Sequence, residues 1–200
     1  MIDKDKIKKM IDGKGGAAKT SDFTNLGMTC ADVARLYKSG FLERIKHGFY
    51  SYAQDDIISD EKIIKKLFPD GILCMDTALF HYGYSNRTPL EWNVAFERTV
   101  SRSRFKIDYP PIRPYFVDKR IIDIGVTEAE INDGVVMRVY DRERVICDCF
   151  RHKHKMDSET FNKAIQGYVA DANKNIMNLS KYSKELRVFK KINDVIGVWL

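Results

Sequence analysis

Long apolar runs are absent from this 200-residue sequence, and none approaches the roughly 18 residues that a membrane-spanning helix requires. The opening residues, MIDKDKIKKM, lack the apolar centre of a secretory signal peptide. Four cysteines in a chain of this length do not make a disulfide framework, and free thiols suit a reducing compartment. We therefore expect a cytoplasmic protein with no membrane partner.

The short motifs of common enzyme classes are also missing. The sequence has no Walker loop, no G-x-S-x-G, no H-E-x-x-H and no paired-carboxylate pattern of a nucleotidyltransferase. Asp76, His81, Asp141 and Asp148 could be combined into a catalytic centre, as could similar residues in almost any domain of this size. We expect no enzymatic activity, no catalytic residue and no cofactor. The alternative is a nucleotide-handling enzyme built on the C-terminal part, which would depend on Asp76 or Asp148.

Two thiols and two imidazoles lie close together in CDCFRHKH, which begins at Cys147. On a regular helix Cys147 and Cys149 point roughly 200° apart, so both cannot face one ion. The spacing C-x-C-x2-H-x-H also matches no standard zinc pattern. Cys149 instead fits an apolar helix face with Val145, Ile146 and Phe150, as a small hydrophobic residue. We therefore expect no metal site.

Hydrophobic residues make up 44% of the chain and charged residues 31%, which is enough apolar material for a folded core. The formal net charge is +6. Residues 1–54 contain ten Lys or Arg and six Asp or Glu, a net charge of +4, which leaves +2 for the other 146 residues. This concentration of positive charge favours an acidic partner such as nucleic acid.

The first 27 residues predict two helices. Ile7, Met10 and Ile11 recur at helical spacing within residues 4–12, and the glycine-rich GKGG at 13–16 ends that helix. A short second helix begins with Thr20 as N-cap and ends at Gly27, where a left-handed residue is wanted.

The next stretch, GMTCADVARLYKSGFLERIKHGFYSY at 27–52, changes its period at Gly40. Before Gly40 we predict a helix with Thr29 as N-cap and Asp32 in the first turn, burying one apolar face made of Val33, Leu36 and Tyr37. After Gly40, aromatic and β-branched residues predict strands at 41–45 and 49–52, with residues 46–48 as the turn.

The order helix, helix, helix, hairpin predicts a winged helix-turn-helix DNA-binding domain in residues 1–54. The second helix of such a motif enters the major groove, and the hairpin lies against the backbone. Arginine suits guanine, so Arg35 is the expected base reader, while the hairpin cations would contact phosphates. The alternative is a winged helix used for protein contacts. The candidate DNA-binding residues are Thr20, Ser21, Thr29, Asp32, Arg35, Lys38, Arg44, Lys46 and His47.

A polar linker at 53–56 separates this domain from a C-terminal domain at 55–200. We predict strands at 92–96, 115–117 and 135–140, with Asn132-Asp133-Gly134 as a turn before the last. Helices are predicted at 61–68, 73–82, 142–151 and 158–171, followed by a basic pair between 178 and 198. The expected fold class is α+β, with a helical C-terminus.

Two groups of residues carry a resemblance to a known family. The first is Gly27-Met28-Thr29, Val33, Leu36, Ser39-Gly40, Leu42, Arg44 and Gly48-Phe49-Tyr50. The second is Asp76-Thr77-Ala78-Leu79, His81-Tyr82-Gly83, Val139-Tyr140-Asp141-Arg142-Glu143-Arg144 and Asp148-Cys149. In this order they resemble the AbiEi-type antitoxins, the regulatory partners in bacterial type IV abortive-infection toxin-antitoxin pairs. The resemblance extends over nearly the whole chain.

The resemblance implies a two-part protein. Its winged helix would bind inverted repeats of double-stranded DNA in its own promoter and repress transcription. Its C-terminal domain would counteract a nucleotidyltransferase-like toxin without forming a stable complex; the alternative is neutralisation of the toxin by direct binding. The chain departs from many relatives by carrying lysines and a histidine where they carry arginines on the reading helix and hairpin. Lysine contacts phosphate well but reads bases less well than arginine.

Overall fold

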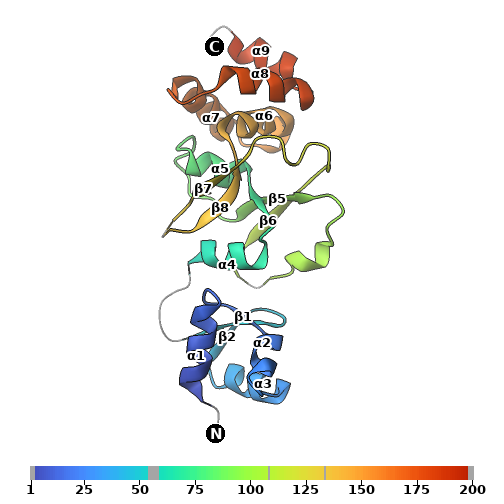
Figure 1. Cartoon of the computed structure of the whole chain (residues 1–200). Helices are drawn as coiled ribbons and strands as arrows, with labels where there is room; N and C mark the ends of the chain where they lie inside the picture. The colour runs from blue at the N-terminus through green and yellow to red at the C-terminus, as the bar shows by residue number, and fades with distance from the viewer. Residues whose placement is uncertain (1–2, 54–58, 108, 133, 198–200) are drawn as a thin grey trace. The chain divides into compact units, whose positions relative to one another are not determined.

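The computed structural model describes residues 3–53, 59–107, 109–132 and 134–197. The chain divides into two compact units, Met1–Pro69 with Ser101–Ile112 (unit 1) and Asp70–Val100 with Arg113–Leu200 (unit 2). The predicted α+β class with a helical C-terminus is confirmed (Figure 1). Residues 54–58, which hold the predicted domain boundary and most of the predicted linker, lie outside the described residues, as does Asp133 of the predicted turn.

Unit 1 begins with helix α1 (Lys4–Gly13), as its apolar spacing predicts. The Asp3 carboxylate accepts a hydrogen bond from the Lys6 N–H at 3.1 Å and caps the helix. Ile7 and Ile11 are buried on the inner face. They join one core with residues from the two following helices, from the sheet and from the position just before β2: Ala18, Phe23, Val33, Leu36, Phe41 and Leu42.

The sheet of unit 1 has three strands in the order β1-β3-β2. The hairpin β2 (Leu42–Lys46) and β3 (Phe49–Tyr52) is antiparallel and confirms the predicted hairpin. Gly48 has a φ of 79°, a conformation that glycine adopts readily, so the chain can reverse there. The two-residue strand β1 (Ala18–Lys19) was not predicted, because two residues are too few to show the alternation of polar and apolar residues typical of a strand.

Between β1 and β2 lie helices α2 (Thr20–Asn25) and α3 (Cys30–Lys38). Phe23 is the buried residue of α2, and Gly27 follows in the left-handed conformation with a φ of 83°, as predicted. The predicted N-cap of α2 is wrong by one position. Lys19 is the N-cap, and its N–H donates to Asp22 Oδ2 at 2.8 Å, so Thr20 is the first residue of the helix.

Unit 1 also contains α4 (Asp60–Leu67) and the short 3-10 helix η1 (Arg102–Phe105). Helix α4 buries Ile63, Ile64 and Leu67 on one face, which is the amphipathic pattern expected of it. Phe68, just after α4, stacks on Phe105 with 5.7 Å between ring centroids.

Unit 2 is built on a five-stranded sheet in the order β6-β5-β4-β8-β7. The strands are β4 (Ile72–Leu73), β5 (Trp92–Glu97), β6 (Ile112–Val117), β7 (Val126–Glu130) and β8 (Val136–Tyr140). Central strand β4 pairs antiparallel with β5 and parallel with β8, where Leu73 lies opposite Val139. The sequence did not predict β4 or β7.

The helices of unit 2 gather mainly at its C-terminal end (Figure 1). They are α5 (Met75–His81), α6 (Arg142–His152), the 3-10 helix η2 (Lys153–Lys155), α7 (Ser158–Ala170), α8 (Ile176–Glu185) and α9 (Phe189–Ile196). Every residue of α6 from Glu143 to Phe150 is buried, rather than one apolar face alone. In the described part of the chain, no helix is both long and apolar enough to span a bilayer.

Gly125 marks a close approach between the loop before β7 and the start of α6. Its φ is 72°, and a Cβ atom there would lie 2.6 Å from Arg144 Cβ and 2.8 Å from Asp141 Oδ1. The Asp141 N–H donates to the Gly125 carbonyl at 2.7 Å. Only glycine meets both the conformational and the spatial requirement at this position.

Candidate nucleic-acid interface

Helix α3 begins at the predicted N-cap, Thr29, and the structure shows that this cap is reciprocal with Asp32. Thr29 Oγ1 accepts from the Asp32 N–H at 3.2 Å, and Asp32 Oδ2 accepts from the Thr29 N–H at 2.9 Å. The Thr29 hydroxyl also donates to Asp32 Oδ2 at 2.7 Å. These hydrogen bonds lower the pKa of Asp32. The Asp32 carboxylate therefore holds the start of the helix, and its contact with DNA stays a prediction.

The two faces of α3 differ in burial and charge. Val33 and Leu36 are buried in the core of unit 1. On the outward face Arg35 and Lys38 are exposed, and the Arg35 side chain is 71% accessible. Arg35 Nη1 lies 3.6 Å from Asp32 Oδ1, a surface pair that leaves most of the guanidinium in solvent.

Tyr37 was predicted to be buried with Val33 and Leu36, and this is wrong. Its side chain is 42% exposed and lies at the flank of α3, facing the sheet. The Tyr37 ring packs edge-on against Tyr50 at 6.4 Å, and the Arg44 guanidinium lies over it at 5.5 Å. Tyr37 therefore joins α3 to the hairpin, which brings Arg44 beside the helix.

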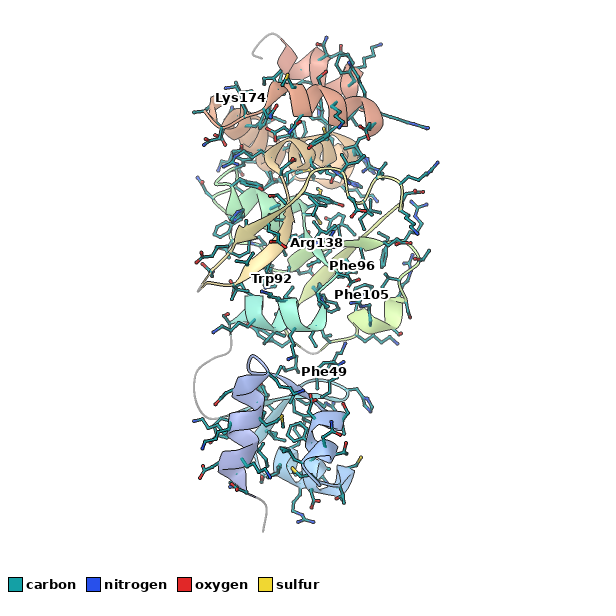
Figure 2. All side chains as sticks on the ribbon, viewed as in Figure 1. Phe49, Trp92, Phe96, Phe105, Arg138 and Lys174 are labelled. Carbon is teal, nitrogen blue, oxygen red and sulfur yellow. The ribbon has the colours of Figure 1, made fainter. Side chains whose placement is uncertain are left out.

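The other two predicted DNA contacts on the hairpin, His47 and Lys46, differ in exposure. His47 is exposed in the turn between β2 and β3. Lys46 is half-buried, with its ammonium 4.8 Å from the centroid of the Phe49 ring, which Figure 2 labels. Lys46 Nζ also donates to the Arg104 carbonyl at 3.5 Å. Burial lowers the pKa of Lys46, with smaller contributions from the positive charges of Arg104 and Lys19.

The predicted contacts on α2 lie at its first turn. Thr20 is half-buried, and its N–H and hydroxyl both donate to the Gly48 carbonyl, at 2.9 and 3.3 Å. Thr20 therefore ties α2 to the turn of the hairpin. Ser21 is exposed.

The sequence did not draw attention to Lys19. The pairing of β1 with β3 sets Lys19 opposite Phe49, and the Lys19 ammonium lies 5.6 Å from that ring. A second cation thus reaches the ring that Lys46 covers. The position of Lys19 beside Phe49 follows only from the pairing of a two-residue strand, so neither composition nor hydrophobic periodicity could indicate it.

Three of the four residues considered for catalysis in unit 2 have a structural contact, and the fourth, Asp76, is partly buried. Asp141 caps α6, accepting from the Arg144 N–H at 2.8 Å and from the Tyr182 hydroxyl at 3.1 Å. Asp148 accepts from Arg144 Nε at 3.0 Å. The His81 ring packs against Tyr82 at 4.9 Å. Burial raises the pKa of Asp76 in the first turn of α5.

The cysteines and histidines of the cluster that begins at Cys147 lie in different environments. Cys147 and Cys149 are buried, the His152 ring packs against Tyr115 at 5.9 Å, and His154 is exposed. Within residues 3–53, 59–107, 109–132 and 134–197, no three His, Cys, Asp or Glu side chains are grouped to hold a metal ion.

Comparison with known proteins yields a likeness in fold. No protein-family model matches the chain, and no curated protein matches it. Among solved structures, the chain is similar to the RV2827C protein from Mycobacterium tuberculosis, with a TM-score of 0.68 and 10% sequence identity. The match covers 88% of this chain and 69% of that chain. At this identity the likeness shows the fold alone.

Proposed function

We propose that residues 1–54 act as a winged helix-turn-helix and bind double-stranded DNA. The observation that carries this proposal is the outward face of α3, where Arg35 and Lys38 are exposed while the opposite face is fixed in the core. An α-helix fits the major groove, and an arginine there can donate two hydrogen bonds to one guanine.

The hairpin supports the same proposal. Tyr37 holds Arg44 beside α3, and His47 lies exposed at the turn. A cation next to a major-groove helix is suited to a phosphate of the flanking backbone. We expect Arg35 and Thr29 to contact base edges, and Lys38, Arg44 and His47 to contact phosphates.

The test is a fluorescence-anisotropy titration of the full chain on the region upstream of its own gene and on an unrelated duplex of equal length. We expect tighter binding to the upstream region, and log K should fall by about 0.9 per tenfold rise in salt for each phosphate neutralised. Equal affinity for the two duplexes would remove the repressor part of the proposal. No binding to either duplex would remove DNA binding altogether.

The resemblance to AbiEi-type antitoxins supports a more specific role. We propose a cytoplasmic antitoxin that represses its own promoter through inverted repeats and counteracts a nucleotidyltransferase-like toxin through its C-terminal part. The support is the resemblance of residues in both parts of the chain, in the same order.

Co-expression with the toxin encoded beside its gene tests this role. We expect growth to be restored by the full chain and by a variant with Arg35→Ala, because Arg35 lies outside the C-terminal part. Failure of the full chain to restore growth would exclude the antitoxin role. Co-purification of the two proteins as a stable complex would favour neutralisation by direct binding instead.

A further inference from the structure

Unit 2 contains a cavity of about 400 Å³ that is partly open to solvent, a size typical of small-molecule sites. Its walls come from the start of α5, strands β5 and β6, the end of β8, and the C-terminal half of α6 with η2. Basic side chains on three of these walls line it: Arg98 just after β5, Arg113 on β6, and Arg151 and Lys155 on α6 and η2. All four belong to unit 2.

The two carboxylates that line the cavity are already engaged by arginines. Asp148 accepts from Arg144 Nε through one oxygen and from Arg151 Nη1 through the other, both at 3.0 Å. Asp118 accepts from Arg120 Nε at 3.0 Å and from Arg120 Nη2 at 3.2 Å. The negative charge on the cavity wall is therefore matched by Arg144, Arg151 and Arg120.

Three lining cations remain. Among the residues that the structure describes, the exposed Arg98, Arg113 and Lys155 form no direct ion pair, although Arg98 acts on Asp118 and Arg113 on Asp76 from a longer distance. Arg144 lies behind the wall, fully buried, and its Nη2 atom has no hydrogen-bond acceptor in that part of the chain. Like charges around one concave surface repel each other, and a polyvalent anion relieves that repulsion.

Part of the remaining surface is aromatic and can donate hydrogen bonds. Tyr115 and His152 are half-buried with 5.9 Å between their ring centroids, and both line the cavity. The Arg113 guanidinium lies 5.7 Å from the centre of the Tyr115 ring. Burial raises the pKa of Tyr115 to about 12, so its hydroxyl keeps its proton at neutral pH.

We propose that this cavity binds the phosphate group of a small molecule, with Arg98, Arg113 and Lys155 as its ligands. A phosphate monoester carries a charge close to −2 and three acceptor oxygens, which matches three cations lining one pocket better than a single carboxylate does. Tyr115 and His152 would form the wall beside the rest of the molecule. The site is independent of the DNA-binding face proposed for unit 1.

The test is isothermal titration calorimetry of the full chain with inorganic phosphate, ribose 5-phosphate, adenosine 5′-monophosphate and uncharged adenosine. We expect at least one phosphate compound to bind and adenosine not to bind. Which of the three binds best distinguishes free phosphate from a sugar phosphate and a nucleotide. The double variant Arg98→Ala, Arg113→Ala should weaken that binding about tenfold or more, since it removes two charge-assisted contacts.

The matched control is Lys190→Ala, Lys191→Ala, which removes two exposed positive charges from α9. It should keep the affinity of the unmodified chain. Lys155→Ala is a second, independent variant on the exposed η2 segment and should also weaken binding. DNA binding should be the same in every variant, which separates this site from the DNA-binding proposal.

Three results would overturn the proposal: no binding of any phosphate compound, adenosine binding as tightly as its monophosphate, or equal loss in the cavity and control variants.

Discussion

Helices α3 and α6 each begin with a side-chain cap and carry an arginine near an aspartate, but the two arginines have opposite surroundings. Arg35 on α3 is 71% exposed and lies 3.6 Å from its aspartate. Arg144 on α6 is 0% exposed and donates to Asp148 at 3.0 Å and to the carbonyls of Ile121 and Ile124.

This difference in exposure shows which arginines are available to bind a partner. A guanidinium surrounded by protein acceptors has already exchanged water for fixed hydrogen bonds, and its removal leaves buried groups unpaired. A guanidinium in solvent contributes little to stability and can bind an anion. Arg144 therefore maintains the fold of unit 2, whereas Arg35 can act on a ligand.

The largest expected effect is on Arg144. Replacing Arg144 by Met should lower the free energy of unfolding by about 3–5 kcal/mol, because Asp148 and two carbonyls lose a buried partner. Urea unfolding followed by circular dichroism measures this. Arg35→Met is the matched control and should change stability by less than about 0.5 kcal/mol. Equal losses in the two variants would contradict the distinction between these helices.

The second effect is on recognition. Arg35→Ala should reduce the preference for the upstream region over unrelated DNA by about 1–3 kcal/mol, if Arg35 reads a base. Competition anisotropy measures the preference at fixed salt. Lys119→Ala, which removes an exposed charge from unit 2, serves as the control. An unchanged preference in Arg35→Ala would assign base reading to another residue of α3.

The stability that the capping aspartates of the two helices contribute, Asp141 for α6 and Asp32 for α3, should change with pH in opposite directions. Burial raises the pKa of Asp141, the N-cap of α6, to about 6, against about 3.9 for an unfolded aspartate. The unfolded chain loses this proton at lower pH than the folded chain. The stability contributed by Asp141 is thus fully present below about pH 4 and is lost as the pH rises through about 6.

Asp141→Asn keeps an oxygen that accepts the Arg144 N–H but cannot ionise. The free energy of unfolding of the original chain, minus that of this variant, should fall as the pH rises from about 4 to about 7. Urea unfolding at four pH values measures it. For Asp32, whose pKa is lowered by hydrogen bonds from Thr29, the corresponding difference with Asp32→Asn should instead fall as the pH drops. The same trend in both variants would show that the caps do not differ as described.

The smallest effect concerns the salt dependence of DNA binding. Lys38→Ala should reduce the slope of log K against log salt by about 0.9, the loss of one phosphate contact. Lys46→Ala should change the slope less, because its ammonium is half-buried against Phe49 and bonded to the Arg104 carbonyl. A larger change for Lys46 than for Lys38 would make the hairpin the main backbone contact.

Much of α3 and its hairpin could be predicted because the local signals agree. The Thr29–Asp32 cap, the Val33 and Leu36 spacing, and the left-handed glycines at 40 and 48 all lie within one short stretch. Each of them depends on neighbours in sequence, so no knowledge of the rest of the fold was needed.

The features that were missed depend on distant partners. β7 has the sequence VTEAE and no buried residue, so its polarity hid a strand that exists by pairing with β8. Tyr37 has helical spacing with the core but packs against Tyr50 of β3. The cavity of unit 2 joins residues from Cys74 to Lys155, and no periodicity could bring them together.

Because β4 pairs in parallel with the distant strand β8, the two sheets of the protein can be completed only one after the other during synthesis. Every strand of the β1-β3-β2 sheet is available once Tyr52 has left the ribosome, whereas Leu73 must wait for Val139. Domains fold as units while the chain emerges, and pairings between distant segments form late. A nascent chain that stops before Val136 would therefore carry a finished N-terminal sheet and a central strand of unit 2 still open to other chains.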